Sequence, residues 1–283
     1  MIEIPERLQW IADFPGGAEW LERLPRLVDE ATEQWSLELE EPYEYANVSL
    51  AVPAGDAVLK IGFPHWESEH EAAALAHWDG HGAVRLLADD AERNAMLLER
   101  CVPGTSLLDL PDEDGYRHAA EVKRKLGERP APPGHPFTPI ADTAERWARE
   151  LPERYAEAGR PFEPELLDAA VSALVELPPT QGELVVCHQD FHRGNVLAAQ
   201  REPWLAIDPK PVVAEREFDT AALIRDGPGD LRRRLDFLAA ELELDRERMR
   251  RWAIAHTVAW GFSEGEAGVY ESHIDIARSL LRL

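Results

Sequence analysis

The first part of the chain combines one helical pattern with several short strand patterns. Apolar side chains recur at nearly helical spacing over residues 18–35, which predicts an amphipathic helix despite Pro25. Residues 36–62 have the character of strands: SLELE alternates, NVSLAV is strand-like, and AVLKIGF follows a turn at residues 53–56. This stretch therefore predicts a helix followed by a small sheet.

A second helix and two more strands are expected next. Over residues 68–80, Ser68 is placed to cap a helix and Glu71 to complete a capping box. Residues 83–88 and 95–102 are apolar runs separated by the polar segment DDAERN, which predicts two further strands.

The pattern changes after the break VPGT at residues 102–105. Residues 112–177 are mainly helical in pattern, with a Pro- and Gly-rich interruption. Residues 183–208 carry three short apolar runs, the last two arranged as a hairpin, and helical patterns resume from about residue 216. We expect a small strand-rich lobe with one helix, a tight hinge, and a larger helical lobe that carries one hairpin.

Composition narrows the class of protein. The 283 residues include 54 Asp and Glu against 30 Lys and Arg, a net charge of -24, with 45% hydrophobic residues and nine Trp. Such a chain folds as a globule, and its charge repels nucleic acid but attracts cationic ligands and Mg²⁺. Cys101 and Cys187 lie in apolar runs and indicate buried thiols of a reducing compartment. Without a signal-like start or a membrane-spanning apolar run, we expect a cytoplasmic protein with no membrane partner.

The most informative stretch runs from Val186 to Leu197 and continues to Asp208. A strand leads into a loop that holds Asp190, and Asn195 follows five residues later at the start of the next strand. Hairpin geometry brings Asn195 and Asp208 together as two oxygen ligands with Asp190 beside them. Hard oxygen ligands suit Mg²⁺, and the remaining carboxylate is able to orient a hydroxyl and accept its proton.

These motifs carry a family resemblance. The spacing from Asp190 to Asn195 is that of the kinase catalytic loop, and H-x-D-x-H-x-x-N resembles the aminoglycoside phosphotransferase branch of the kinase-like fold. AIDPK, VLKIG, WDGHGAVRLL and LLERCVPGTSL are similar to the streptomycin 6-kinase-type, or aminoglycoside/hydroxyurea resistance, kinases. The resemblance implies an α+β, protein-kinase-like bilobal fold, with a nucleotide-binding lobe over residues 1–101 and a catalytic and substrate-binding lobe over residues 102–283.

The resemblance gives the loop residues their roles. It implies that Asp190 is the catalytic base and that Asn195 and Asp208 bind Mg²⁺; the alternative is that all three are polar residues of turns and strand ends. We expect His188 to brace the loop by hydrogen bonding rather than to transfer protons. His188 and His192 also have the spacing of zinc ligands on a helix, but the strand-loop-strand context and the missing third ligand argue against zinc.

In the first lobe, the resemblance implies a site for ATP or GTP. Lys60 matches the kinase lysine that holds the α- and β-phosphates and pairs with a helix Glu, for which Glu71 is preferred and Glu67 remains open. The alternative for Lys60 is a surface lysine whose charged end reaches water. Adenine is expected to bond to the backbone of the hinge, at Glu99 and Cys101.

Two residues near the end of the matched region have open roles. Lys210 of the DPK motif is expected to reach the transferred phosphate, to shield the pocket, or to pair with an acid such as Glu215. Asp219 matches the structural Asp of the family and is interpreted as a helix cap.

The sequence also departs from the pattern of the family. The turn over the nucleotide, about residues 45–51, contains no glycine, so Asn47 and Ser49 are expected to supply polar groups there. Gln189 occupies a position that is often Gly, and PVVAEREFD (residues 211–219) replaces a glycine-containing run.

The implied activity is transfer of the γ-phosphate to a hydroxyl of a small, cationic molecule, an aminoglycoside such as streptomycin. Other acceptors stay open: hydroxyurea, a sugar or a choline-like metabolite. A non-catalytic nucleotide-binding regulator is disfavoured because Asp190, Asn195, Asp208 and Lys60 are all present. The chain is expected to be a monomer or a homodimer. Trp260 and Tyr270 are candidates for either a pocket wall or core packing, and five acids are candidates for binding a cation: Asp226, Asp230, Glu264, Glu266 and Glu271.

Overall fold

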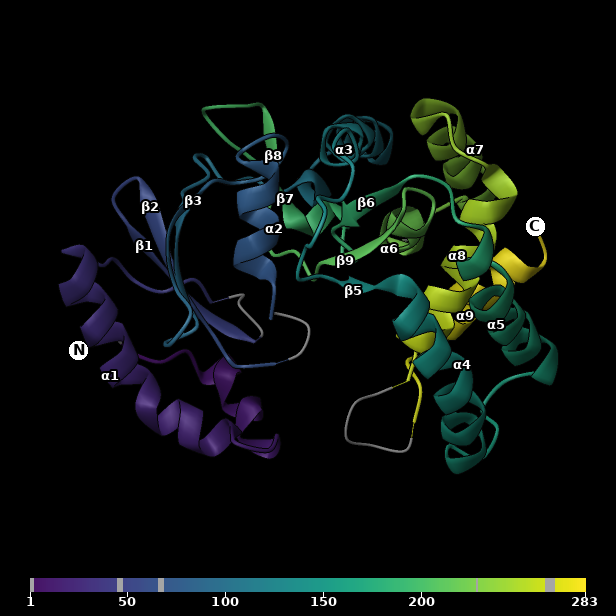
Figure 1. The fold of residues 1–283 in the computed structure, drawn as a ribbon, viewed down its shortest axis with the longest axis horizontal. Coiled ribbons are helices and arrows are strands. Elements are labelled where there is room, and N and C mark those ends of the chain that lie inside the picture. The colour runs from purple at the N-terminus through teal and green to yellow at the C-terminus, as the bar shows by residue number, and fades with distance from the viewer. Residues whose placement is uncertain (1–2, 45–47, 66–68, 228, 263–267) are drawn as a thin grey trace. The chain divides into compact units, whose positions relative to one another are not determined.

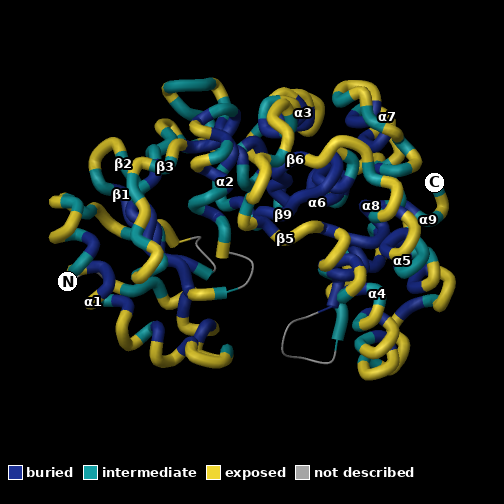
Figure 2. Tube along the Cα trace, viewed as in Figure 1, coloured by how far each residue is buried: buried dark blue, intermediate teal, exposed yellow. Residues whose placement is uncertain are grey.

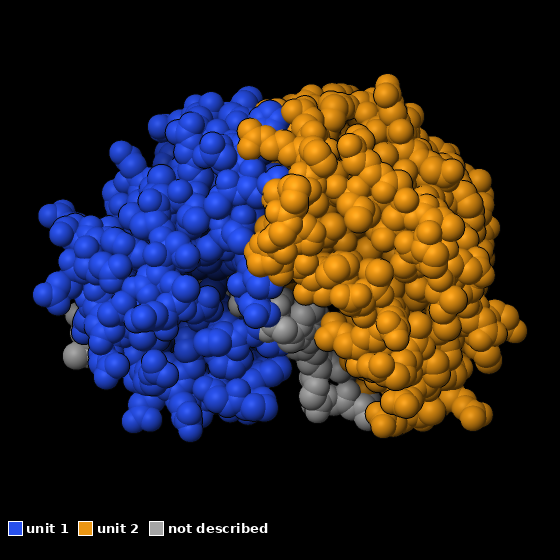
Figure 3. All heavy atoms as spheres, viewed as in Figure 1, with its two compact units in different colours: residues 1–105, 198–207 blue, residues 106–197, 208–283 orange. Residues whose placement is uncertain are grey.

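The computed structural model describes residues 3–44, 48–65, 69–227, 229–262 and 268–283 (Figure 1). By its internal contacts the chain divides into two compact units, shown in Figure 3. Unit 1 comprises residues 1–105 and 198–207, and unit 2 comprises residues 106–197 and 208–283. The predicted domain division at residues 101 and 102 stays a prediction.

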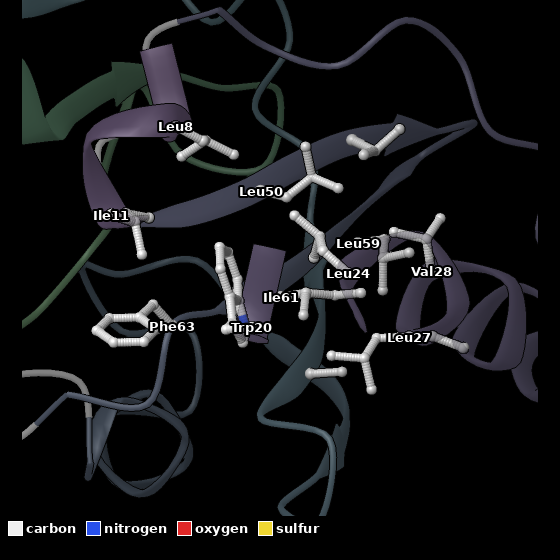
Figure 4. Close-up of a cluster of buried hydrophobic side chains, with 13 residues drawn as sticks. Leu8, Ile11, Trp20, Leu24, Leu27, Val28, Leu50, Leu59, Ile61 and Phe63 are labelled. Carbon is white, nitrogen blue, oxygen red and sulfur yellow. The ribbon is translucent and has the colours of Figure 1, made fainter. Parts of the chain in front are cut away.

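Unit 1 is built on a four-stranded antiparallel sheet of order β1-β2-β4-β3. Its elements are η1 (Glu6–Asp13), α1 (Gly17–Trp35), β1 (Ser49–Ala54), β2 (Ala57–Gly62), α2 (Glu71–Trp78), β3 (Leu86–Asp90), β4 (Ala95–Glu99) and β8 (Trp204–Ala206). Figure 4 shows apolar side chains of η1 and α1, among them Leu8, Trp20 and Leu24, packed against Leu59 and Ile61 of β2. Burial of this face explains why α1 forms as the apolar spacing predicts.

The late segment 198–207 belongs to unit 1 through main-chain pairing. Ala206 donates to the Gly82 carbonyl at 2.8 Å, and Val84 donates to the Ala206 carbonyl at 3.0 Å. Its side chain Arg201 binds both carboxylate oxygens of Glu99, at 2.7 and 2.9 Å. The predicted hairpin therefore exists, as β7 (Val196–Ala198) and β8, and it also ties residues far apart in sequence into one unit.

Unit 2 is mainly helical and contains a small sheet of order β5-β9-β6. Its helices are η2 (Leu107–Asp109), α3 (Asp112–Leu126), α4 (Ile140–Glu157), α5 (Pro164–Glu176), η3 (Pro178–Thr180), η4 (Arg193–Asn195), η5 (Phe218–Thr220), α6 (Ala221–Arg225), α7 (Leu231–Leu242), α8 (Arg246–Ala259) and α9 (Glu271–Leu281). Its strands are β5 (Thr138–Pro139), β6 (Leu184–Cys187) and β9 (Val212–Glu215). Every residue from Trp252 to Ala259 is buried, so α8 runs through the core of this unit (Figure 2).

Three local predictions differ from the structure. Residues 36–40 are not a strand, although Leu37 and Leu39 pack against the unit 1 core as the alternation requires. The strand predicted at 83–88 is shifted to Leu86–Asp90, and β9 was missed because PVVAE has no alternation. Ser68, the predicted cap of α2, lies outside the described residues; the residue before the helix is His70, with no side-chain cap bond. No helix in the described part of the chain is long and apolar enough to cross a membrane.

Candidate active site

A buried lysine–glutamate pair lies in unit 1. Lys60 occupies β2, which is hydrogen-bonded on both sides, opposite Ala51 of β1 and Met96 of β4. Its Nζ lies 2.6 Å from Oε1 and 2.7 Å from Oε2 of Glu71, in the first turn of α2. The Lys60 and Glu71 side chains are only 9% and 3% exposed. Lys60 is therefore not a surface lysine, and Glu71 is a partner, as the sequence predicts; Glu67 lies outside the described residues.

The predicted hinge residues are placed at the end of β4. Glu99 is the last residue of β4, and its carboxylate binds Arg201 and the Arg85 N–H rather than facing a ligand. Burial, followed by the charge of Glu99, raises the pKa of the Cys101 thiol to about 12, so this thiol stays protonated. Ser49 is buried at the start of β1, and Asn47 lies outside the described residues.

The loop after β6 holds the predicted catalytic residues of unit 2. Asn195 donates its Nδ2 to the Asp190 carbonyl at 3.0 Å, which closes the five-residue loop on itself. Gln189 has φ +64°, a left-handed conformation that glycine adopts most easily, so the departure from glycine here places a strained residue next to Asp190. Asp208 has φ +60°, a second left-handed residue in this group. His188 is fully buried, and its bracing role through side-chain hydrogen bonding stays a prediction.

Asp219 fixes the backbone of this loop. Its carboxylate accepts hydrogen bonds from the N–H groups of His188 and Gln189, at 2.9 and 2.7 Å, and forms an ion pair with the buried Lys123 of α3. The first helical turn beside it, η5, begins after Glu217 and has no side-chain cap bond. The interpretation of Asp219 as a helix cap is therefore wrong: its hydrogen bonds go to a segment about thirty residues earlier.

The Asp190 carboxylate lies beside a lysine. Lys210 Nζ is 3.4 Å from Asp190 Oδ2, and the Lys210 N–H donates to the His188 carbonyl at 3.0 Å. Glu215, the alternative partner, instead accepts from Arg248 and from the Trp252 indole, both at 2.5 Å. Lys210 thus contacts the candidate catalytic carboxylate directly.

The side chain of His192 contacts groups within the loop itself. His192 Nδ1 accepts from the Gly194 N–H at 3.1 Å, and its Nε2 is 4.0 Å from Asp190 Oδ1. Across the described ranges, no group of three or more His, Cys, Asp or Glu is arranged to hold a metal ion.

Of the five acids considered for cation binding, two accept hydrogen bonds from backbone or arginine groups, one is exposed, and two lie outside the described residues. Asp226 accepts from the Arg193 N–H and Nε at 2.8 and 3.0 Å, and Asp230 caps α7 through the Arg233 N–H at 3.0 Å. Glu271 is exposed in the first turn of α9, while Glu264 and Glu266 fall outside the described residues.

Tyr270 is exposed, whereas Trp260 contacts two basic side chains. Tyr270 is 51% exposed before α9. Trp260 directly follows α8, and its ring lies 4.8 Å from Lys210 Nζ and 5.1 Å from the Arg225 guanidinium carbon. Trp260 is therefore part of the surroundings of Asp190 rather than core filling alone.

Sequence reasoning missed three residues that hold this region together. Arg193, only 3% exposed, bonds to Asp226 and to Asp112 of α3, while Arg225 and His256 contact each other at 2.9 Å. Arg193 lies inside the motif H-x-D-x-H-x-x-N, so its position in the motif could have identified it. Arg225 and His256 come from helices with no motif of their own.

Comparison with known proteins places this geometry in a family. A family model described as aminoglycoside/hydroxyurea antibiotic resistance kinase matches residues 46–268. The chain is 33% identical over 302 residues to streptomycin 6-kinase of Streptomyces glaucescens, covering 99% of this chain and 97% of that protein. It is 36% identical over 300 residues to hydroxyurea phosphotransferase of Kitasatospora aureofaciens, covering 99% and 86%.

Solved structures show the fold. Choline kinase LicA from Streptococcus pneumoniae superposes with a TM-score of 0.66 at 12% identity, covering 92% of this chain and 98% of that one. ADP-bound aminoglycoside phosphotransferase APH(2'')-Ib gives a TM-score of 0.60 at 13% identity, covering 91% and 96%. The expected α+β, protein-kinase-like bilobal fold is confirmed. Together with the identities over nearly the whole chain, this shows that the chain belongs to the aminoglycoside/hydroxyurea antibiotic resistance kinase family.

Proposed function

We propose that this protein is an ATP-dependent O-phosphotransferase that phosphorylates a hydroxyl of a small molecule, with an aminoglycoside such as streptomycin as the first candidate. The observation that carries the proposal is the Asp190 carboxylate beside Lys210, on a loop closed by Asn195. Phosphoryl transfer depends on positioning and on neutralising spread negative charge, and this arrangement supplies both a proton acceptor and a cation. We place the enzyme in the cytoplasm, where ATP is supplied.

In unit 1, Lys60 is proposed to bind the α- and β-phosphates of the nucleotide. An ammonium buried to this degree needs a counterion, and Glu71 fixes its position with two short bonds. The backbone at Glu99 and Cys101 is proposed to bind adenine, and Ser49 and Asn47 to line the turn above the phosphates. ATP is the proposed donor, with GTP as the alternative; the ADP-bound phosphotransferase of the same fold supports use of a nucleotide.

Mg²⁺ is proposed to be held by Asn195, in the loop after β6, and by Asp208, which follows β8. Because the Asn195 Nδ2 donates to the Asp190 carbonyl, the Oδ1 is left as the ligand atom. Asp208 adds a carboxylate, and an amide plus a carboxylate are hard ligands of the kind Mg²⁺ prefers. When bound, Mg²⁺ neutralises charge on the nucleotide phosphates.

Asp190 and Lys210 are proposed to act at the point of transfer. Asp190 orients the acceptor hydroxyl and takes its proton, which requires a carboxylate with access to the acceptor; its side chain is 13% exposed. Lys210, whose Nζ contacts the Asp190 carboxylate, is proposed to bind the transferred phosphoryl group.

The acceptor is proposed from the relatives. Two of them are named streptomycin 6-kinase, which makes streptomycin the first candidate. Hydroxyurea is the second candidate, because the relative named hydroxyurea phosphotransferase is 36% identical to the chain.

A substrate panel tests the proposal. The purified protein is incubated with MgATP and streptomycin, other aminoglycosides or hydroxyurea; ADP release gives the rate, and phosphorus NMR locates the new ester. We expect Asp190→Ala to abolish turnover while MgATP binding survives, and Asp114→Ala, an exposed acid of α3, to leave the rate unchanged. A largely unchanged rate in Asp190→Ala would contradict the proposed role of Asp190 as the proton acceptor. Failure with every aminoglycoside but turnover of hydroxyurea would select the second acceptor.

A further inference from the structure

Two basic side chains share one aromatic ring next to Asp190. Lys210 Nζ, 3.4 Å from the Asp190 carboxylate, lies 4.8 Å from the centre of the Trp260 ring. The guanidinium carbon of Arg225, at the end of α6, lies 5.1 Å from the centre of the same ring. Both distances are within the range of a cation–π interaction. We call Lys210, Arg225 and Trp260 the Trp260 cluster; all of it belongs to unit 2.

A neutral histidine orients Arg225. The Arg225 Nη1 lies 2.9 Å from His256 Nδ1, and because a guanidinium only donates, Nδ1 accepts and the ring proton is on Nε2. His256 is fully buried and stacks on Trp260 at 4.7 Å. Burial, reinforced by the Arg225 charge, holds the pKa of His256 well below its usual 6.5. The imidazole therefore fixes the direction of the guanidinium without neutralising it.

Within the described residues, the Arg225 guanidinium is not paired with a carboxylate. Among the residues that the structure describes, its guanidinium hydrogen-bonds to His256 and forms no ion pair. The two acids whose charges act on it are Asp190 and Asp226. Asp226 already accepts two hydrogen bonds from Arg193, and Asp190 is next to Lys210. A partly buried cation with no ion-pair partner among the described residues is costly, so this arrangement is matched to an anionic ligand.

We propose that Lys210 and Arg225, carried on the Trp260 ring, form a phosphate subsite beside Asp190 that binds the phosphoryl group during transfer and in the product. The inference rests on the proposed phosphotransferase function and adds Arg225 to it, with Trp260 and His256 as positioning residues. In the step, the acceptor oxygen forms a bond to the γ-phosphorus while the bond to the β,γ-bridging oxygen breaks. ADP leaves with that electron pair, and the hydroxyl proton passes to Asp190. Charge on the equatorial oxygens is what two adjacent cations stabilise.

A transition-state mimic tests the subsite without any acceptor. Isothermal titration measures the affinity for MgADP with and without aluminium fluoride, which imitates the phosphoryl group in transfer. Aluminium fluoride is expected to increase the affinity of the wild type for MgADP. We expect Arg225→Gln to reduce this increase, the gain from fluoride, about 10- to 100-fold, which corresponds to the loss of one hydrogen bond to a charged group. The affinity for MgADP alone is expected to stay unchanged. Trp260→Leu is expected to reduce it in the same direction. Arg233→Gln, whose side chain is 76% exposed on α7, is the matched control and is expected to behave as wild type.

The outcomes separate this inference from the proposed function. A gain from fluoride that survives intact in Arg225→Gln overturns the subsite. If that variant instead lowers kcat/KM for one acceptor only, the guanidinium binds the acceptor and the subsite is also wrong. If wild type shows no gain at all, the phosphotransferase proposal itself fails. Thermal midpoints show whether each variant folds. If Arg225→Gln does not fold, Arg225→Lys replaces it, because lysine keeps the charge but lacks the paired donors of the guanidinium. We expect Arg225→Lys to reduce the gain from fluoride about 3- to 10-fold.

Discussion

Replacing Lys123 by methionine tests how the loop that carries Asp190 is held in place. Lys123 and Asp219 are 6% and 3% exposed and form an ion pair inside unit 2. The same carboxylate accepts the N–H groups of His188 and Gln189, so the pair is connected directly to the backbone that precedes Asp190. Loss of the cation is therefore expected to loosen the loop as well as to destabilise the unit.

The size of the effect follows from what the substitution leaves behind. Methionine keeps the length of the side chain and its contact with the Phe191 ring, which Lys123 Nζ approaches to 5.0 Å. Asp219 becomes a buried carboxylate without a cation. Removing one partner of a buried ion pair costs about 3–5 kcal/mol. Because two amide donors remain on the Asp219 carboxylate, we expect the lower end, about 3 kcal/mol.

Hydrogen exchange measures this at the loop itself. Mass spectrometry of a peptide covering residues 185–191 reports the opening of the amides that Asp219 binds. Since every 1.4 kcal/mol is a factor of ten, exchange of this peptide is expected to speed up about 100-fold in Lys123→Met. Arg124→Met is the control on the same helix, because its side chain is 50% exposed and its loss is expected to cost less than about 1 kcal/mol.

A double-mutant cycle separates the ion pair from simple loss of packing. Asp219→Asn removes the charge and retains one amide acceptor, so adding it to Lys123→Met is expected to cost at least about 2 kcal/mol less than the two single changes together. Exchange in Lys123→Met within threefold of the Arg124→Met control would refute the idea that the pair holds the loop. Additive single effects would show that the two side chains act independently.

Three further changes have defined outcomes. Lys60→Met leaves the Glu71 carboxylate buried without its cation, and we expect MgATP affinity, measured by titration, to fall at least about tenfold; unchanged affinity would contradict the phosphate role. Gln189→Gly relieves the φ of +64° and removes a buried Nε2 that has no hydrogen-bond partner, so the urea midpoint is expected to rise by the equivalent of about 1 kcal/mol. Burial, then the Arg225 charge, lowers the pKa of His273 to about 4. The unfolded chain therefore binds this proton first, and stability that is complete above pH 6.5 is expected to fall towards pH 4. Because His273 is only partly buried, the loss is expected to be smaller than the full shift implies. His273→Asn should flatten that dependence in urea titrations at pH 7 and pH 5, and an unchanged slope would exclude His273 as its origin.

The sequence was sufficient where the chemistry is local. The spacing between Asp190 and Asn195 and the hairpin that follows predicted a loop that the structure closes with one hydrogen bond. The Lys60–Glu71 pair was predictable because a lysine in an apolar strand needs a counterion, and the next helix offers one. In both cases the partners lie within about a dozen residues of each other.

Prediction failed where partners are distant or where two patterns look alike. Asp219 was interpreted as a helix cap from its match to the structural Asp of the family, yet its hydrogen bonds go to the loop after β6. Residues 36–40 alternate like a strand but do not form one, although the Glu40 N–H donates to the Pro53 carbonyl of β1 at 2.8 Å. The meeting of Arg225 and His256 on Trp260 has no sequence signal, because a cation–π contact follows from the packing of α6 against α8 and not from spacing.

The distribution of counterions explains why the net charge of the chain says little about its chemistry. Lys60 has a dedicated carboxylate in Glu71, so its charge is fixed in place before any ligand arrives. Lys210 shares the carboxylate of Asp190, the residue proposed to accept a proton, so the charge balance there changes as the reaction proceeds. Arg225 has a histidine held neutral by burial in place of a carboxylate. A chain with a charge of -24 has many acids available for pairing. An arginine that is partly buried beside the reaction centre and has no ion pair among the described residues is therefore better explained by a ligand that brings its own negative charge than by chance.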